Sequence, residues 1–245
     1  MLVATAVCAA PLGQGHAPVF ASLSPVQDAP ADTAAYRARI LELSYALRAF
    51  VDSLHEAGVE EVFTLGLGGN APADPLEKMD QVRRSGIGFS NPEADRISSE
   101  LQRWGRALRW GFRDLNQPLV SRIVIRKKDH TAIWYHQNVE LLRTEIAVGN
   151  PLIGKATPEG AYHVLYVDFR PISRWIRGNV PYGHEYNPYG ARQIPFFQDW
   201  TMHGNNDASA LGKDISKGCV RFHNAEILVL AELVLAVRTR VDVVP

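Results

Sequence analysis

Apolar residues recur at helical spacing in the first half of the chain. Between Thr33 and Ala57 they alternate steps of four and three residues, which places them on one helix face. They are Tyr36, Ile40, Leu43, Leu47, Phe50 and Leu54. Asp32 is a candidate cap at the start and Gly58 a candidate stop at the end. The pattern predicts an amphipathic helix over residues 33–57.

A second apolar stripe follows a glycine-rich segment at residues 59–90, which we expect to be irregular. The helix start is Asn91-Pro92-Glu93, with a cap, a proline at the first position and an acid in the first turn. The stripe consists of Ile97, Leu101, Trp104, Leu108, Phe112 and Leu115. The rest of this helix carries Arg96, Arg103, Arg106, Arg109 and Arg113. These arginines form either a solvated face, which is the more common case, or a patch that binds an anionic polymer.

After Pro118 the pattern changes to short runs rich in Ile, Val, Tyr and Thr, which are typical of β-strands. The predicted strands are residues 121–126, 131–135, 140–148, 161–167 and 240–244. Closely spaced short strands favour a sandwich or a barrel. Residues 169–199 mix Pro and Gly with aromatics and are expected to form a long loop over a site. Asn224 is expected to cap a helix over residues 225–237.

Together these patterns predict an α+β protein. A helical N-terminal region would occupy residues 32–117, and a mostly-β, sandwich-like domain residues 118–245. Residues 1–31 would be a signal and linker. The stretch from Met1 to Ala21 is either a secretion signal cleaved near Ala21 or a disordered tail, because it is apolar but lacks positive leading residues. Its removal would leave Cys219 as the only cysteine.

Charge and composition exclude several kinds of partner. Lys+Arg and Asp+Glu both number 26, so the net charge is zero and nothing draws the chain to nucleic acid. No apolar run reaches the roughly 20 residues that a membrane span needs. We expect no metal, because five of the histidines show no partner pattern. They are His130, His136, His163, His184 and His223.

Candidate chemistry lies between His203 and Cys219. A thiolate is the reactive form of cysteine and needs a base or a positive environment to form near neutral pH, so His203 is the candidate base. The alternative for Cys219 is an inert buried thiol. Gly204 and Gly218 flank the two residues and allow close approach of backbone to a substrate.

Three further residues are candidates for substrate contact or for the turn. Gly218 is either a donor to a developing oxyanion or a plain turn glycine. Arg221 would share a face with Cys219 and either hold a substrate carboxylate or form a structural ion pair. Ser216 is favoured as a local hydrogen-bonding residue of the turn.

The segment from His203 to Asn224 resembles the signature of YkuD-type L,D-transpeptidases. The shared features are the His203-Gly204 start, the block Ser216-Lys217-Gly218-Cys219-Val220-Arg221, and an Asn that opens a helix. Upstream, Thr157-Pro158-Glu159-Gly160 and Asn187-Pro188-Tyr189-Gly190 resemble family turns. The resemblance covers residues of about 121–244, and many family members have His where this chain has Lys217.

The resemblance implies a peptidoglycan-modifying enzyme without a cofactor. Cys219 would attack a tetrapeptide stem, D-Ala would leave, and the thioester would pass to an amine of a neighbouring stem to form a cross-link. His203 would be the base, oriented by the Gly204 carbonyl. Gly218, Ser216, Arg221 and Asn205 would lie around the substrate or the oxyanion, and carbapenems would acylate Cys219.

Two other functions stay open at this stage. The first is hydrolysis of the same stems by an L,D-carboxypeptidase or amidase, because water can replace the amine at the thioester. The second is a wall-binding module without chemistry, which the intact His203, Gly218 and Cys219 disfavour. Action on peptidoglycan would place the protein in the periplasm or cell envelope.

Overall fold

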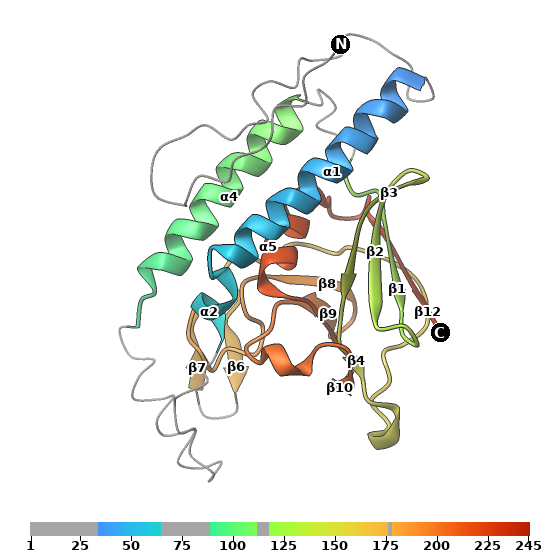
Figure 1. The fold of residues 1–245 in the computed structure, drawn as a ribbon. Coiled ribbons are helices and arrows are strands. Elements are labelled where there is room, and N and C mark those ends of the chain that lie inside the picture. The colour runs from blue at the N-terminus through green and yellow to red at the C-terminus, as the bar shows by residue number, and fades with distance from the viewer. Residues whose placement is uncertain (1–33, 65–88, 112–117, 176–177) are drawn as a thin grey trace.

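The computed structural model describes residues 34–64, 89–111, 118–175 and 178–245 (Figure 1). The expected cap at Asp32, the signal or tail over residues 1–31, Arg113, and the end of the second stripe at Phe112 and Leu115 lie outside these residues. Most of the segment expected to be irregular, residues 65–88, lies outside them as well.

Both predicted helices are present, with a short third helix between them. Helix α1 (Ala34–Glu56) ends at Gly58, which has a left-handed φ of 73° and leads into α2 (Val59–Phe63). Helix α4 (Pro92–Gly111) begins where it was predicted, because the Asn91 side chain accepts a hydrogen bond from the Ala94 N–H at 3.0 Å.

Some arginines of α4 form ion pairs or hydrogen bonds, and others are exposed to solvent. Arg96 forms ion pairs with Glu93 and Glu100 on its own helix. Arg109 instead donates to the backbone carbonyl of Glu232 in the second half of the chain. Arg103 and Arg106 are exposed. The solvated face predicted for these residues therefore holds for part of the set, and one member links two helices.

The second half contains one mixed five-stranded sheet. Its order is β3-β2-β1-β12-β5, and β1 pairs with β12 in parallel whereas the other neighbours are antiparallel. The strands are β1 (Arg122–Arg126), β2 (Thr131–His136), β3 (Val139–Glu145), β5 (Gly160–His163) and β12 (Arg240–Val244).

Three smaller sheets complete the strands. The three-stranded sheet has the order β11-β9-β8, where β8 is Gln193–Phe197, β9 is Trp200–His203 and β11 is Val220–Arg221. Strand β4 (Val148–Gly149) pairs with β10 (Asp214–Ser216), and β6 (Ser173–Trp175) pairs with β7 (Gly178–Val180). Short 3₁₀ turns lie at Pro151–Ile153 and Ala208–Ala210.

The architecture confirms the α+β prediction, but four local predictions were wrong. The predicted strand 140–148 is split into β3 and β4, and the one at 161–167 ends at His163. The predicted loop at 169–199 contains β6, β7 and β8; β6 pairs with β7, and β8 pairs with the next strand, β9. Helix α5 (Asn224–Leu233) stops short of the predicted end, as the Val234 backbone turns extended.

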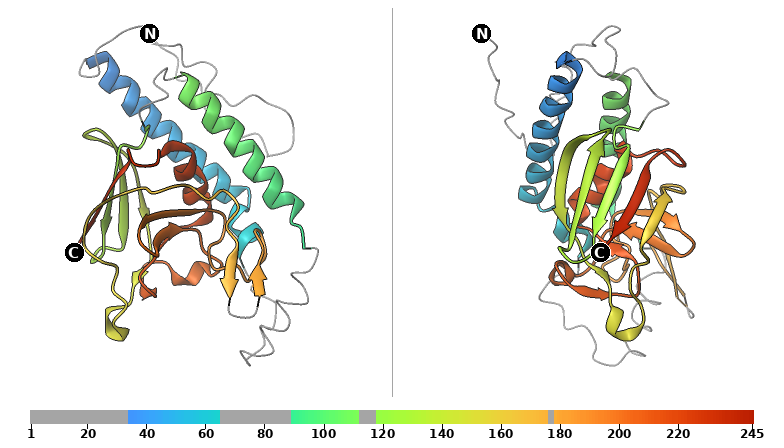
Figure 2. Two further views of the ribbon diagram at one scale, coloured as in Figure 1. Left: turned by 180° about the vertical axis from the view of Figure 1, so that it is seen from behind. Right: turned by 90° about the vertical axis from the view of Figure 1, so that its right-hand side faces the viewer.

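Helix α5 lies at the centre of the molecule. All ten of its residues are buried, and it contacts α1, α2 and α4 on one side and β8 on another (Figures 1 and 2). A helix that is apolar all round must be covered on all sides. The helical region supplies part of that cover, so apolar residues from both halves of the chain form one core.

The start of α5 is capped differently from the prediction. Asn224 is the first residue of the helix, and its side chain does not cap it. The first N–H groups of a helix lack intrahelical partners, and here the Ala225 N–H donates to the Glu60 carboxylate of α2 at 2.8 Å. The cap is therefore supplied from a residue that lies far away in sequence.

Among the residues that the structure describes, no helix combines the length and the apolar character needed to cross a membrane.

The shared core leads to a stability prediction. Leu47→Ala removes a fully buried side chain of α1, and we expect a loss of about 2–5 kcal/mol in the free energy of unfolding. The matched control is Leu41→Ala on the same helix, where Leu41 is 47% exposed, and its effect should stay below about 0.5 kcal/mol. Urea unfolding measures both. Equal effects would show that α1 does not pack as described.

Candidate active site

Strands β9 and β11 bring the predicted reactive residues to one face of the small sheet. The two strands are parallel, with Arg221 opposite His203 and Val220 opposite Met202. Met202 and Val220 are fully buried in the core. Because side chains alternate along a strand, His203, Arg221 and the adjacent Cys219 point to the other face.

His203 is held in one tautomer. The side chain is only 4% exposed, and its Nδ1 lies 2.6 Å from the carbonyl oxygen of Gly204. A carbonyl oxygen can only accept, so the proton of the neutral ring sits on Nδ1 and Nε2 keeps its lone pair. The ring of Tyr189 packs edge-on against the imidazole at a centroid distance of 5.3 Å. The ring is thereby fixed with its basic nitrogen available.

Burial keeps both His203 and Cys219 neutral. It lowers the pKa of His203 to about 3, with a further lowering by the charge of Arg221, against weaker opposing hydrogen bonds to the carbonyls of Gly204 and Pro188. Burial also raises the pKa of the Cys219 thiol, although the backbone of Thr201 and the charge of Arg221 oppose this. The resting pair near neutral pH is a thiol and an uncharged imidazole.

The thiol remains reachable from solvent. Cys219 is partly exposed, and its Sγ lies 4.0 Å from the carbonyl oxygen of Asp199. Lys217 is exposed and is not among the groups that act on the thiol pKa. The positive charge near the sulfur is therefore that of Arg221.

The turn before Cys219 is built by Ser216 and Gly218. The buried Ser216 hydroxyl donates to the Cys219 carbonyl at 2.5 Å and accepts from the Gly218 N–H at 3.0 Å. Gly218 has a φ of +113°, and a side chain there would collide with the indole of Trp200. Use of the Gly218 N–H by an oxyanion therefore requires the Ser216 hydroxyl to release it.

Arg221 has no partner of opposite charge in the described part of the chain. Its Nε is buried without a hydrogen bond, and no carboxylate of the described residues lies within ion-pair distance. Burial lowers its pKa, opposed by the negative charges of Asp207 and of the Cys219 thiolate. An unpaired guanidinium beside a thiol can accept the carboxylate of a substrate.

Asn205 shapes the loop after β9. Its side-chain amide donates to the carbonyl of Asp207, and its Oδ1 accepts the Asp207 N–H at 3.3 Å. The side chain is buried, so its contacts are with the protein. The sequence placed Asn205 near the substrate, but it did not indicate this role in holding the loop.

Four aromatic residues between Tyr182 and Trp200 separate into two kinds. Tyr186 is buried, and Tyr182 donates to the carbonyl of Ala94 in α4. Phe197 and Trp200 stack at a centroid distance of 5.4 Å beside Gly218. Trp200 thus packs against the turn before Cys219. The sequence did not indicate this contact, because Trp200 and Gly218 are distant in sequence.

The low pKa of His203 predicts acid sensitivity. An unfolded histidine titrates near 6.5, so between pH 6.5 and about 3 the unfolded chain binds the extra proton and the folded chain does not. The stability that the protein gains from keeping His203 neutral is fully present above pH 6.5. As the pH falls through that window, the free energy of unfolding decreases by up to about 1.4 kcal/mol per pH unit.

His203→Gln should flatten that part of the pH dependence of unfolding, measured by urea titration from pH 7 to 4. The exposed His163→Gln is the control and should leave the slope unchanged. Identical slopes in both variants would show that His203 is not the buried neutral base described above.

Two known proteins from Bacillus species are similar in sequence to part of this chain. YkuD of Bacillus licheniformis, provisionally named an L,D-transpeptidase, is 41% identical over 125 residues, which are 51% of this chain and 66% of that protein. YqjB of Bacillus subtilis, named in the same provisional way, is 37% identical over 91 residues, 35% of this chain and 50% of that protein. The chain therefore spans about half to two thirds of the length of these relatives.

A solved structure, the catalytic domain of an Enterococcus faecium L,D-transpeptidase, is 17% identical with a TM-score of 0.41 and covers 51% of this chain and 96% of its own. The family model of the L,D-transpeptidase catalytic domain matches residues 121–243, half of the chain. Those residues contain the described strands β1 to β11, most of β12, helix α5 and the His203–Cys219 site. The chain belongs to the YkuD family of L,D-transpeptidase catalytic domains.

Proposed function

We propose that this protein is a peptidoglycan L,D-transpeptidase that acts through a thioester on Cys219. Family membership supports the reaction class. The observation that carries the residue assignment is the hydrogen bond from His203 Nδ1 to the Gly204 carbonyl, which leaves the lone pair of the neutral ring on Nε2. We also propose action in the cell envelope, since that is where peptidoglycan stems occur.

Acylation begins from the neutral pair. As the Cys219 sulfur attacks the carbonyl of the peptide bond before D-Ala, the thiol proton passes to Nε2 of His203. The sulfur–carbon bond forms and gives a tetrahedral oxyanion. The carbon–nitrogen bond then breaks, and D-Ala leaves with the proton from Nε2. The neutral imidazole is restored beside a thioester.

Transfer repeats these steps in reverse. A neutral amine of a second stem attacks the thioester, gives a proton to Nε2 and forms the new amide bond. The sulfur leaves and recovers the proton from the imidazolium. Because the pKa of His203 is so low, the imidazolium exists only briefly and returns its proton readily.

Arg221 suits the recognition of a substrate carboxylate. It shares the face of the site with Cys219, and its guanidinium has no charged partner among the described residues. The D-Ala residue of a tetrapeptide stem ends in such a carboxylate. A charge-assisted pair there would orient the bond to be broken over the sulfur.

The outcome of the reaction is tested with purified protein and tetrapeptide stems, with and without an amine acceptor. We expect cross-linked product that depends on the acceptor, and its loss in Cys219→Ala by at least about a thousandfold. Cys8→Ala is the matched control and should behave like the wild type. Tripeptide formed equally with and without acceptor would indicate a hydrolase, and no turnover by the wild type would indicate a binding module.

The pH dependence of acylation tests the neutral pair. We expect the rate constant for a carbapenem adduct on Cys219 to stay nearly constant from pH 5 to 8, since neither pKa lies in this range. In His203→Gln only free thiolate can react, so a much lower rate should rise about tenfold per pH unit. Intact-mass spectrometry follows both. A wild-type rate that rises as steeply as the variant's would exclude His203 as the base.

A further inference from the structure

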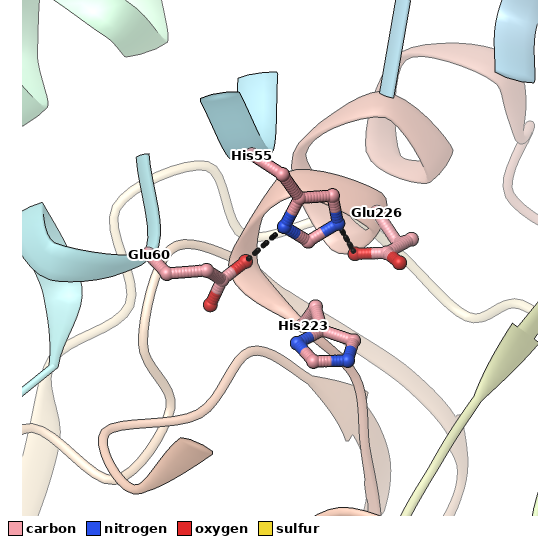
Figure 3. A group of neighbouring side chains, drawn as sticks. All are labelled: His55, Glu60, His223 and Glu226. Carbon is pink, nitrogen blue, oxygen red and sulfur yellow. Dashed lines mark ion pairs between the residues drawn. The ribbon is translucent and has the colours of Figure 1, made fainter. Parts of the chain in front are cut away.

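A second cluster of polar side chains lies where the helical region contacts helix α5. His55 comes from the end of α1, Glu60 from α2, and His223 and Glu226 from the start of α5 (Figure 3). Each offers one ligand atom, and all four atoms lie within 4.8 Å of one another. Three helices therefore bring four nitrogen and oxygen donors close together.

The donor set has the chemistry of a transition-metal site. Two imidazoles with two carboxylates suit Zn²⁺, which takes four such ligands in a tetrahedron at about 2.0–2.2 Å. Ligand atoms on one such ion are roughly 3.3 Å apart by that geometry. His55 Nε2 and Glu226 Oε2 are already 3.2 Å apart. Glu60 Oε1 lies 3.8 Å from Nδ1, the other nitrogen of the same ring, and one ion takes only one of these nitrogens.

One of the donor atoms lacks a partner. Nδ1 of His223 is buried without a hydrogen bond, whereas Oε2 of Glu226, which is only 6% exposed, faces His55 Nε2 at 3.2 Å. Buried polar atoms left without a partner are uncommon because their lost hydration is not replaced. A cation beside His223 would satisfy its Nδ1, which the ion pair between His55 and Glu226 leaves unused.

Surrounding contacts hold the carboxylates in place. The Thr144 hydroxyl donates to Glu226 Oε1 at 3.1 Å, so Oε2 is the oxygen left toward the cluster. Glu60 accepts the Ala225 N–H at 2.8 Å and the Asn224 side chain at 3.1 Å. The His55 and His223 rings meet edge to face, with centroids 5.2 Å apart. Such outer contacts orient metal ligands.

We propose that His55, Glu60, His223 and Glu226 bind one Zn²⁺ ion. The ion would fasten α1 and α2 to the start of α5, close after Cys219 in the chain. This site is independent of the proposed function, because none of its residues belongs to the catalytic face. The sequence showed no metal-ligand spacing for these histidines, because the four ligands are spread along the chain from His55 to Glu226.

The test uses the full chain freed of metal by a chelator, with Cys8→Ala and Cys219→Ala as background so that neither thiol can bind the ion. Zn²⁺ titration by calorimetry should give one ion per chain. At a free concentration a hundredfold above Kd, the Tm should rise by roughly 5–10 °C. His55→Gln and Glu226→Gln should each weaken binding at least about tenfold. The exposed His163→Gln is the control and should bind like the background protein.

The circular dichroism spectrum of each metal-free variant is the control for folding. If one ligand variant does not fold, the zinc affinity of the other variant decides the test. Co²⁺ binding to the background protein tests the site without any ligand substitution. Its tetrahedral ligand-field absorption is expected to appear and then to vanish on addition of Zn²⁺. No binding, or equal binding by the ligand variants and His163→Gln, would overturn the proposal and leave the cluster as an ion-pair network.

Discussion

The side-chain amide of Asn224 is the interaction on which the rest of the site depends. Its Oδ1 accepts the N–H groups of Ala191 at 2.9 Å and Asn205 at 3.2 Å, and its Nδ2 donates to the Asn205 carbonyl at 2.7 Å. Gly190 and Gly204 both lie against this oxygen, and a side chain at either would collide with it. One fully buried amide thus fixes the backbone before β8 and after β9 to the start of α5.

This connection determines the position of the reactive pair. The Gly204 carbonyl that fixes the His203 tautomer belongs to the loop that Asn224 holds, and Arg221 lies opposite His203 in the sheet. Burial then acts on both groups in the same sense, since it disfavours the charged thiolate and the charged imidazolium. Both candidate groups are therefore neutral at rest, and Arg221 is the charged group beside them.

Local patterns predicted the parts of the structure that local physics controls. The four-and-three spacing from Tyr36 to Leu54 identified α1, and the Asn91-Pro92-Glu93 start was confirmed by a hydrogen bond. Strand β8 was missed because Pro195 and its neighbours look like loop until Gln193 pairs with His203. The cap at Asn224 was wrong because the amide is engaged by Ala191 and Asn205, while Glu60 supplies the cap. Only tertiary contacts contain that information.

The packing of the two halves of the chain against each other could not be predicted either, because it also depends on tertiary contacts. Helix α5 is apolar on every side, and a sheet can cover only one side of a helix. Its other side is covered by α1, α2 and α4, with Phe50 of α1 stacked on Trp104 of α4 at 4.7 Å. The Arg192 guanidinium, next to β8, donates to Ser98 of α4 at 2.9 Å. Loss of the helices would expose α5, whose first residue holds the His203 loop, so the helical region supports the site without contributing a residue to its face.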